Sequence, residues 1–166
     1  MENRKNFSMT LKYIVMGAAI AAIYATLTLV LQPISFSVYQ VRVSEALSIL
    51  PYFTSSAVPG LFIGCLIANL LGGAVIWDVV FGSIATLIAA AIAYFMKKHN
   101  VSKFLIPLPS VIANTIIIGL LMRYVYNFDM SLLLCMLSIF VGQAIACYVV
   151  GIPLMLAIEK IKIKWE

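Results

Sequence analysis

Long apolar runs separated by short polar segments make up most of the chain. Five runs carry no charged residue, and each is long enough for at least one membrane helix, which needs about 20 residues. These runs are residues 13–41, 46–77, 79–96, 104–122 and 130–158. Their apolar residues are continuous and do not alternate with polar ones, so helices are favoured over the strands of a membrane barrel. The pattern predicts an all-α integral membrane protein.

The stretch 40–78 is too long and too interrupted for a single spanning helix. Pro51 and the Pro59-Gly60 pair break it, and proline removes a helical hydrogen bond and clashes with the preceding turn. We therefore expect two short helices, about 43–53 and 58–71, that fold back on each other. Short paired helices in transport proteins often border a cavity.

Basic residues determine the expected topology. They accumulate in three groups, which the positive-inside rule assigns to the cytoplasm. The groups are Arg4, Lys5 and Lys12; Lys97, Lys98 and Lys103; and Lys160, Lys162 and Lys164. An even number of crossings must separate each group from the next, so the interrupted run must cross twice.

The prediction is thus a single six-helix membrane domain over residues 1–166. Residues 1–11 form a cytoplasmic N-terminal segment and residues 159–166 a cytoplasmic C-terminal tail. The second and third helices are the short pair. The expected helices are 12–31, 43–53, 58–71, 77–96, 104–124 and 131–158.

Composition agrees with this picture and excludes several functions. Hydrophobic residues make up 64% and charged residues 10% of the chain, and the net charge of +5 follows from the cytoplasmic loops, so it gives no support for nucleic-acid binding. The single histidine, His99, excludes a metalloprotease with a histidine pair, and the sequence has no P-loop. We expect no catalytic residues, no metal and no cofactor. Any uphill transport would need a partner or an ion.

Charged residues at the outer ends of the helices are the candidate binding groups. Arg42 and Glu45 lie at the start of the short pair and Asp78 follows it, so folding back would bring the three together. Ionisable groups within a membrane are costly, and a group of them indicates a functional site. Two structural explanations stay open. Arg42 and Glu45 could pair on one helix face, and Asp78 could be a helix N-cap.

Amides and aromatic residues extend the candidate site. Asn69 lies near the charged level and is a candidate ligand, whereas Asn114 and Gln143 are more typical of bonds between helices. Tyr39 and Trp77 are candidates to stack on a planar ligand. They also fit the aromatic belt of a membrane interface.

Small residues follow one side of the first helix at four-residue spacing. Gly17, Ala21 and Ala25 form one stripe, and Ala18 and Ala22 form the adjacent one. Such faces permit close approach of helix backbones. They predict either a partner interface or packing within the bundle.

Three segments resemble the QueT family of queuosine-precursor transporters. They read VRVSEALSILPYF at 41–53, AVPGLFIGCLIANLLGG at 57–73 and WDVVFGSIATLIAA at 77–90. The chain departs from the family pattern at Ser55, where the family has proline after Thr54.

The resemblance implies a substrate-binding S component of an energy-coupling factor (ECF) transporter in a prokaryotic plasma membrane. It implies a 7-deazaguanine ligand, namely queuine, preQ1 or preQ0, and a shared module of one membrane coupling protein and two cytoplasmic ATPases. It also implies that the alanine face of helix 1 meets that module. Two alternatives stay open: an S component for another planar heterocycle, and a membrane scaffold without a small ligand.

A guanine-type ring edge presents two donors beside one carbonyl. Glu45 is the first choice for the donors and Asp78 the alternative. Asn69 or Arg42 suits the carbonyl.

Overall fold

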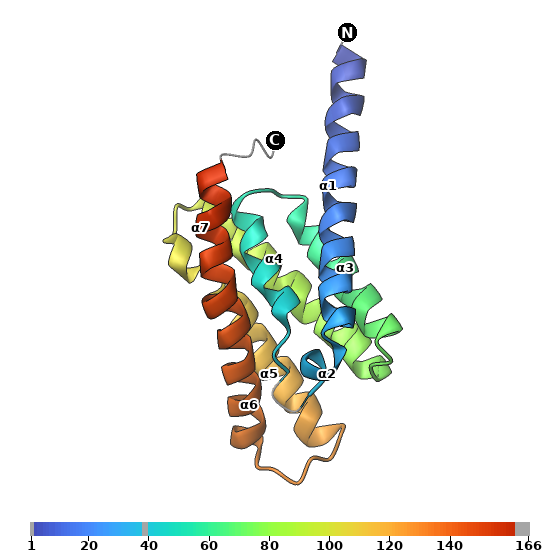
Figure 1. Cartoon of the computed structure of the whole chain (residues 1–166), viewed down its shortest axis with the longest axis vertical. Coiled ribbons are helices and arrows are strands. Elements are labelled where there is room, and N and C mark those ends of the chain that lie inside the picture. Colours follow the sequence, from blue (N-terminus) through green and yellow to red (C-terminus); the bar gives the residue numbers. More distant parts are fainter. Residues whose placement is uncertain (1, 38–39, 162–166) are drawn as a thin grey trace.

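The computed structural model describes residues 2–37 and 40–161, with side chains at residue 7 and from residue 9 onward within these ranges. This part of the chain is a helical bundle without strands. Figure 1 shows that α1 begins and α7 ends at the same end of the bundle, beyond which the first half of α1 projects. The loop between α5 and α6 lies at the opposite end. The elements are α1 (Glu2–Val30), α2 (Gln32–Ser35), η1 (Val43–Tyr52), α3 (Ala57–Leu71), η2 (Asp78–Gly82), α4 (Ser83–Lys98), η3 (Lys103–Leu105), α5 (Leu108–Tyr124), α6 (Leu132–Ala144), η4 (Ile145–Val150) and α7 (Gly151–Ile161).

Four helical stretches in the described chain are long and apolar enough to cross a membrane. They are Met9–Val30, Asp78–Lys98, Lys103–Tyr124 and Leu132–Ile161. The remaining helices α2, η1 and α3 are shorter, and η1 and α3 correspond to the expected short pair. The 15 residues of α3 span about 22 Å and the 10 residues of η1 about 20 Å, against a hydrocarbon core of about 30 Å. The expected short pair is present, whereas the count of six crossings stays a prediction.

The element η1 differs in type from the expected helix, because it is a 3₁₀ helix over its whole length. Runs of this type rarely exceed four residues, since their hydrogen bonds are poorer. Here the segment rises about 2.0 Å per residue, which carries ten residues further than an α-helix would. Every residue from Ser44 to Pro51 is buried, and η1 contacts α1, α4, η4 and α7. Burial on all sides stabilises this unusual segment.

Close packing of α1 against α3 depends on glycine. A Cβ atom at Gly60 would lie 2.8 Å from the carbonyl oxygen of Gly17, and one at Gly64 would lie 2.8 Å from Cβ of Tyr24. Gly17, Ala21 and Ala25 are buried, whereas Ala18 and Ala22 are exposed. The first stripe therefore packs within the bundle, and only the second is available to a partner.

Proline explains several other departures from the expected helices, although not the early start of α1 at Glu2. Pro33 begins the short helix α2, where its missing N–H costs little. The helix α5 begins at Leu108 and not near residue 104, because Pro107 precedes it and Pro109 lies in its first turn. The π segment η4 ends at Val150, shortly before Pro153. In a regular α-helix the ring of Pro153 would clash with the carbonyl of Val149, which lies in the π segment.

Candidate functional site

A cavity of about 260 Å³ lies at the end of the bundle opposite the start of α1. It is bordered by the segment after α2, the turn between α3 and η2, and the loop after α5. Its volume is close to the lower end of small-molecule pockets, about 300 Å³. Its lining residues are Phe36, Ser37, Gln40, Gly72, Gly73, Ala74, Val75, Asp78, Met122, Tyr126 and Phe128.

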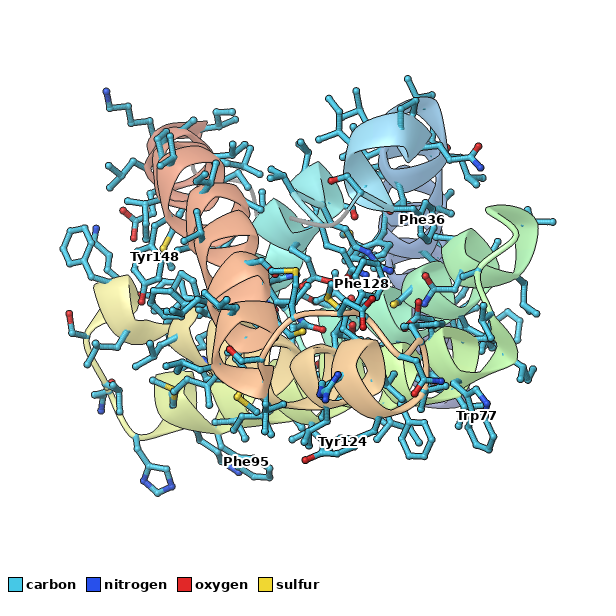
Figure 2. The ribbon with its side chains drawn as sticks, turned by 90° about the horizontal axis from the view of Figure 1, so that it is seen from below. Phe36, Trp77, Phe95, Tyr124, Phe128 and Tyr148 are labelled. Atoms are coloured by element: carbon cyan, nitrogen blue, oxygen red, sulfur yellow. The ribbon has the colours of Figure 1, made fainter. Side chains whose placement is uncertain are left out.

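Two aromatic rings line the cavity, one from the segment after α2 and one from the loop after α5. Figure 2 shows Phe36 and Phe128 directed toward the middle of the bundle, whereas Trp77 points away from it. Gly72 is needed for this arrangement, because a Cβ atom there would lie 2.7 Å from Cζ of Phe36. The loop that carries Phe128 is held by Arg123, whose Nη1 donates to the carbonyl of Phe128 at 3.0 Å.

Glu45 is buried beneath this region, with 1% of its surface exposed. Its Oε1 accepts a hydrogen bond from the Tyr24 hydroxyl, and its Oε2 accepts one from Ser110 Oγ at 2.6 Å. Asn114 supports Ser110 by donating to its carbonyl oxygen at 3.1 Å. Both carboxylate oxygens thus have donors from other helices, and the expected salt bridge with Arg42 is not formed within the described chain.

Arg42 is 3% exposed and is only partly satisfied. Its Nε donates to the carbonyl of Ser35 at 3.4 Å, and its guanidinium lies 5.0 Å from the centre of the Phe36 ring. Its Nη2 is buried without a hydrogen-bond partner. A buried guanidinium nitrogen without an acceptor is costly unless a ligand supplies one.

Asn69 and Asp78 present acceptors at the same level. Asn69 Nδ2 donates to the backbone carbonyl of Asp78 at 3.1 Å, which fixes the amide orientation. The Oδ1 atoms of both residues are buried and unpaired. The side chain of Asp78 does not cap a helix, so that explanation fails, and this residue lines the cavity. Together with Arg42, the site offers one cationic donor and two acceptors.

Tyr126 adds a hydroxyl to the cavity wall from the loop after α5. Its oxygen is buried without a hydrogen-bond partner. Burial raises the pKa of this hydroxyl, and the neighbouring Asp78 carboxylate raises the pKa further. Tyr126 therefore remains a protonated donor over the whole physiological pH range.

The structure groups some of the expected site residues and separates others. Asn69 bonds to Asp78, and Arg42 lies over Phe36, which lines the cavity with Asp78. Glu45 is held instead by its own donors from α1 and α5. Trp77 is 48% exposed and stacks on Phe81 at 6.0 Å, away from the cavity. Tyr39 lies outside the described residues.

Several contributing residues were not singled out from the sequence. Phe36, Tyr126 and Phe128 are aromatic residues near the predicted outer ends of the helices, like Tyr39 and Trp77, but nothing in the pattern indicated that they line a cavity. Nothing in the sequence indicated that Tyr24 and Ser110 would donate hydrogen bonds to Glu45. Asn114 and Gln143 bond within their own helices in the described chain, to Ser110 and Cys147, which corrects the expected contact between helices.

Comparison with known proteins identifies the family of the chain. The model of the QueT transporter family matches residues 14–160, nearly the whole chain. The chain belongs to the QueT transporter family. The resemblance found in residues 41–90 is thereby confirmed, and family membership places the chain among multi-pass membrane transporters and not among enzymes.

A QueT relative carries the name queuosine precursor transporter. This protein, from Lactococcus lactis subsp. cremoris (strain MG1363), is 38% identical over 77 residues, which are 45% of this chain and 45% of the relative. The match thus spans about half the length of that relative. No solved structure matches the chain.

Proposed function

We propose that this QueT family member is the substrate-binding S component of an ECF transporter that imports a queuosine precursor. The proposed ligand is a 7-deazaguanine: queuine, preQ1 or preQ0. The observation that carries the proposal is a set of three buried, unpaired polar atoms. Asp78 Oδ1 belongs to a residue that lines the cavity, and Arg42 Nη2 and Asn69 Oδ1 belong to residues that contact the lining residues Phe36 and Asp78. Family membership and the name of the Lactococcus relative support the same substrate class.

The three free atoms match a guanine-type ligand in polarity, and the unpaired Tyr126 hydroxyl is a further donor at the cavity wall. The donors of a deazaguanine require acceptors, which Asn69 and Asp78 provide, and its carbonyl suits the Arg42 cation. Glu45 was the first choice for the donors from the sequence, but both of its oxygens already accept hydrogen bonds. We therefore assign the ligand contact to Asp78. Glu45 stabilises the site by joining α1 and α5 through its hydrogen bonds.

Aromatic faces complete the proposed site. Phe36 and Phe128 line the cavity and are directed inward, so they are suited to stack on a planar ring. Stacking of a base on an aromatic side chain contributes about 1–3 kcal/mol in nucleic-acid systems. Tyr39 remains a candidate for the same contact, whereas Trp77 fits the membrane interface better.

Energy for import would come from partners. The sequence lacks a P-loop, so the proposed partners are a membrane coupling protein and two cytoplasmic ATPases. Ala18 and Ala22 are exposed on α1 and remain available for close approach of a helix of the coupling protein. Gly17, Ala21 and Ala25 pack inside the bundle and support that face from behind.

A binding panel tests the proposal. The purified chain in detergent or nanodiscs would be titrated with preQ1, preQ0, queuine, riboflavin, thiamine and biotin. Saturable binding of the deazaguanines alone supports the proposal. Binding of one of the vitamins alone would indicate a different S component, and binding of none of the compounds would favour a scaffold.

A further inference from the structure

Charge at the outer end of the bundle does not balance. Arg42, Glu45 and Asp78 are all buried there, so one cation faces two carboxylates. Two exposed residues of opposite sign, Arg123 and Asp129, cancel each other at the mouth. The described residues thus leave one net negative charge beside the cavity.

The carboxylates of Glu45 and Asp78 differ in their hydrogen-bond donors. Glu45 accepts hydrogen bonds from Tyr24 and Ser110, so both oxygens have hydroxyl donors. Asp78 is 6% exposed and its Oδ1 has no donor within the described chain. A buried carboxylate oxygen without a donor is costly, so we assign the excess charge to Asp78, which lies beside the Tyr126 hydroxyl. This residue also lines the cavity, where a ligand reaches it.

We propose that the cavity selects precursors whose 7-substituent is a protonated amine, and that Asp78 determines this selectivity. The inference rests on the proposed function and deepens it. The carbonyl and the 7-substituent are neighbours on a deazaguanine. Arg42 lies over the ring of Phe36, which lines the cavity together with Asp78, so a ligand whose carbonyl meets Arg42 brings its substituent toward Asp78. The ring donors then fall to Asn69 Oδ1.

Two features of the cavity favour a cation at this position. A charge-assisted hydrogen bond from an ammonium to a carboxylate is roughly twice as strong as a neutral one. The rings of Phe36, Tyr126 and Phe128 line the same space, and aromatic faces attract cations when water is excluded. A nitrile in place of the amine carries no positive charge and donates no hydrogen bond, so it satisfies neither feature.

The test compares preQ1, which carries an aminomethyl cation, with preQ0, which carries a nitrile of similar size. Titration calorimetry of the full chain at pH 7 should give at least ten-fold tighter binding of preQ1. In Asp78→Asn the ratio should fall to about three-fold or less, whereas Asp129→Asn should keep the parent ratio.

Equal or tighter binding of preQ0 by the parent chain overturns the inference without any variant, and leaves the proposed function standing. A stable Asp78→Asn that keeps the parent ratio removes Asp78 from the selectivity. Failure of both compounds to bind overturns the proposed function itself.

Discussion

Ser110 donates a hydrogen bond to Glu45 at 2.6 Å, although 65 positions separate the two residues in the sequence. Tyr24 supplies the donor to the other carboxylate oxygen. A single buried carboxylate therefore joins α1, η1 and α5. Because η1 is followed directly by the turn into α3, this junction fixes the elements that carry Arg42 and Asn69.

Replacing Glu45 should destabilise the protein before any ligand is added. The amide of Glu45→Gln has only one acceptor oxygen. Its NH₂ group would face one of the two hydroxyls, of Tyr24 or Ser110, that donate to the carboxylate in the parent protein. Loss of a buried charged hydrogen bond costs about 1.5–3 kcal/mol, so the unfolding temperature of the apo protein should fall clearly. Thermal unfolding in detergent measures the effect.

A matched control is Glu159→Gln, because Glu159 pairs with Lys103 at 2.6 Å on the partly exposed surface. Such pairs contribute about 0–1 kcal/mol, so this variant should unfold close to the parent. Equal unfolding temperatures for the two variants would show that Glu45 does not hold the three elements together.

Enlarging the exposed stripe of α1 should separate binding from transport. Ala18→Leu combined with Ala22→Leu adds bulk outside the bundle, so the isolated chain should bind its ligand normally while uptake in cells is lost. Ala21→Leu is the contrasting variant. Its side chain is buried against α3, and the protein should fail to fold. Normal uptake by the double variant would locate the partner interface elsewhere.

Cysteine labelling tests the topology predicted from charge. Ser102 in the loop before α5 and Asp129 in the loop after it are exposed and lie on opposite sides of a predicted span. A membrane-impermeant reagent should label Asp129→Cys in intact cells, and Ser102→Cys only after the membrane is opened. The native cysteines Cys65, Cys135 and Cys147 are buried and should react slowly. Labelling of Ser102→Cys in intact cells would contradict the orientation.

Apolar runs and prolines were sufficient to predict most of the helical boundaries. The expected helix 58–71 is observed as Ala57–Leu71, and 131–158 as the continuous stretch Leu132–Ile161. The 3₁₀ geometry of η1 was not predictable, because the apolar pattern of a short buried segment does not distinguish a 3₁₀ helix from an α-helix. Tertiary contacts decide its geometry.

The sequence was sufficient to predict which charged residues meet at the candidate site, but not which way the aromatic side chains point. Placing Arg42 and Asp78 together required only that the short pair fold back. Whether an aromatic residue points into a cavity depends on side-chain packing, so Trp77 and Phe36 looked equivalent in the sequence. The partners of Glu45 were also hidden, since a tyrosine and a serine in apolar helices carry no sign of a distant carboxylate.

The affinity of Asp78→Asn for a deazaguanine tests the central claim most directly. Asp78 lines the outer cavity and holds an unpaired carboxylate oxygen, so calorimetry with preQ1 should show binding weakened at least ten-fold. The exposed Asp129→Asn should bind like the parent, and the unfolding temperature of apo Asp78→Asn should confirm that it folds. A folded Asp78→Asn that binds preQ1 with parental affinity would contradict a ligand site built on this cavity.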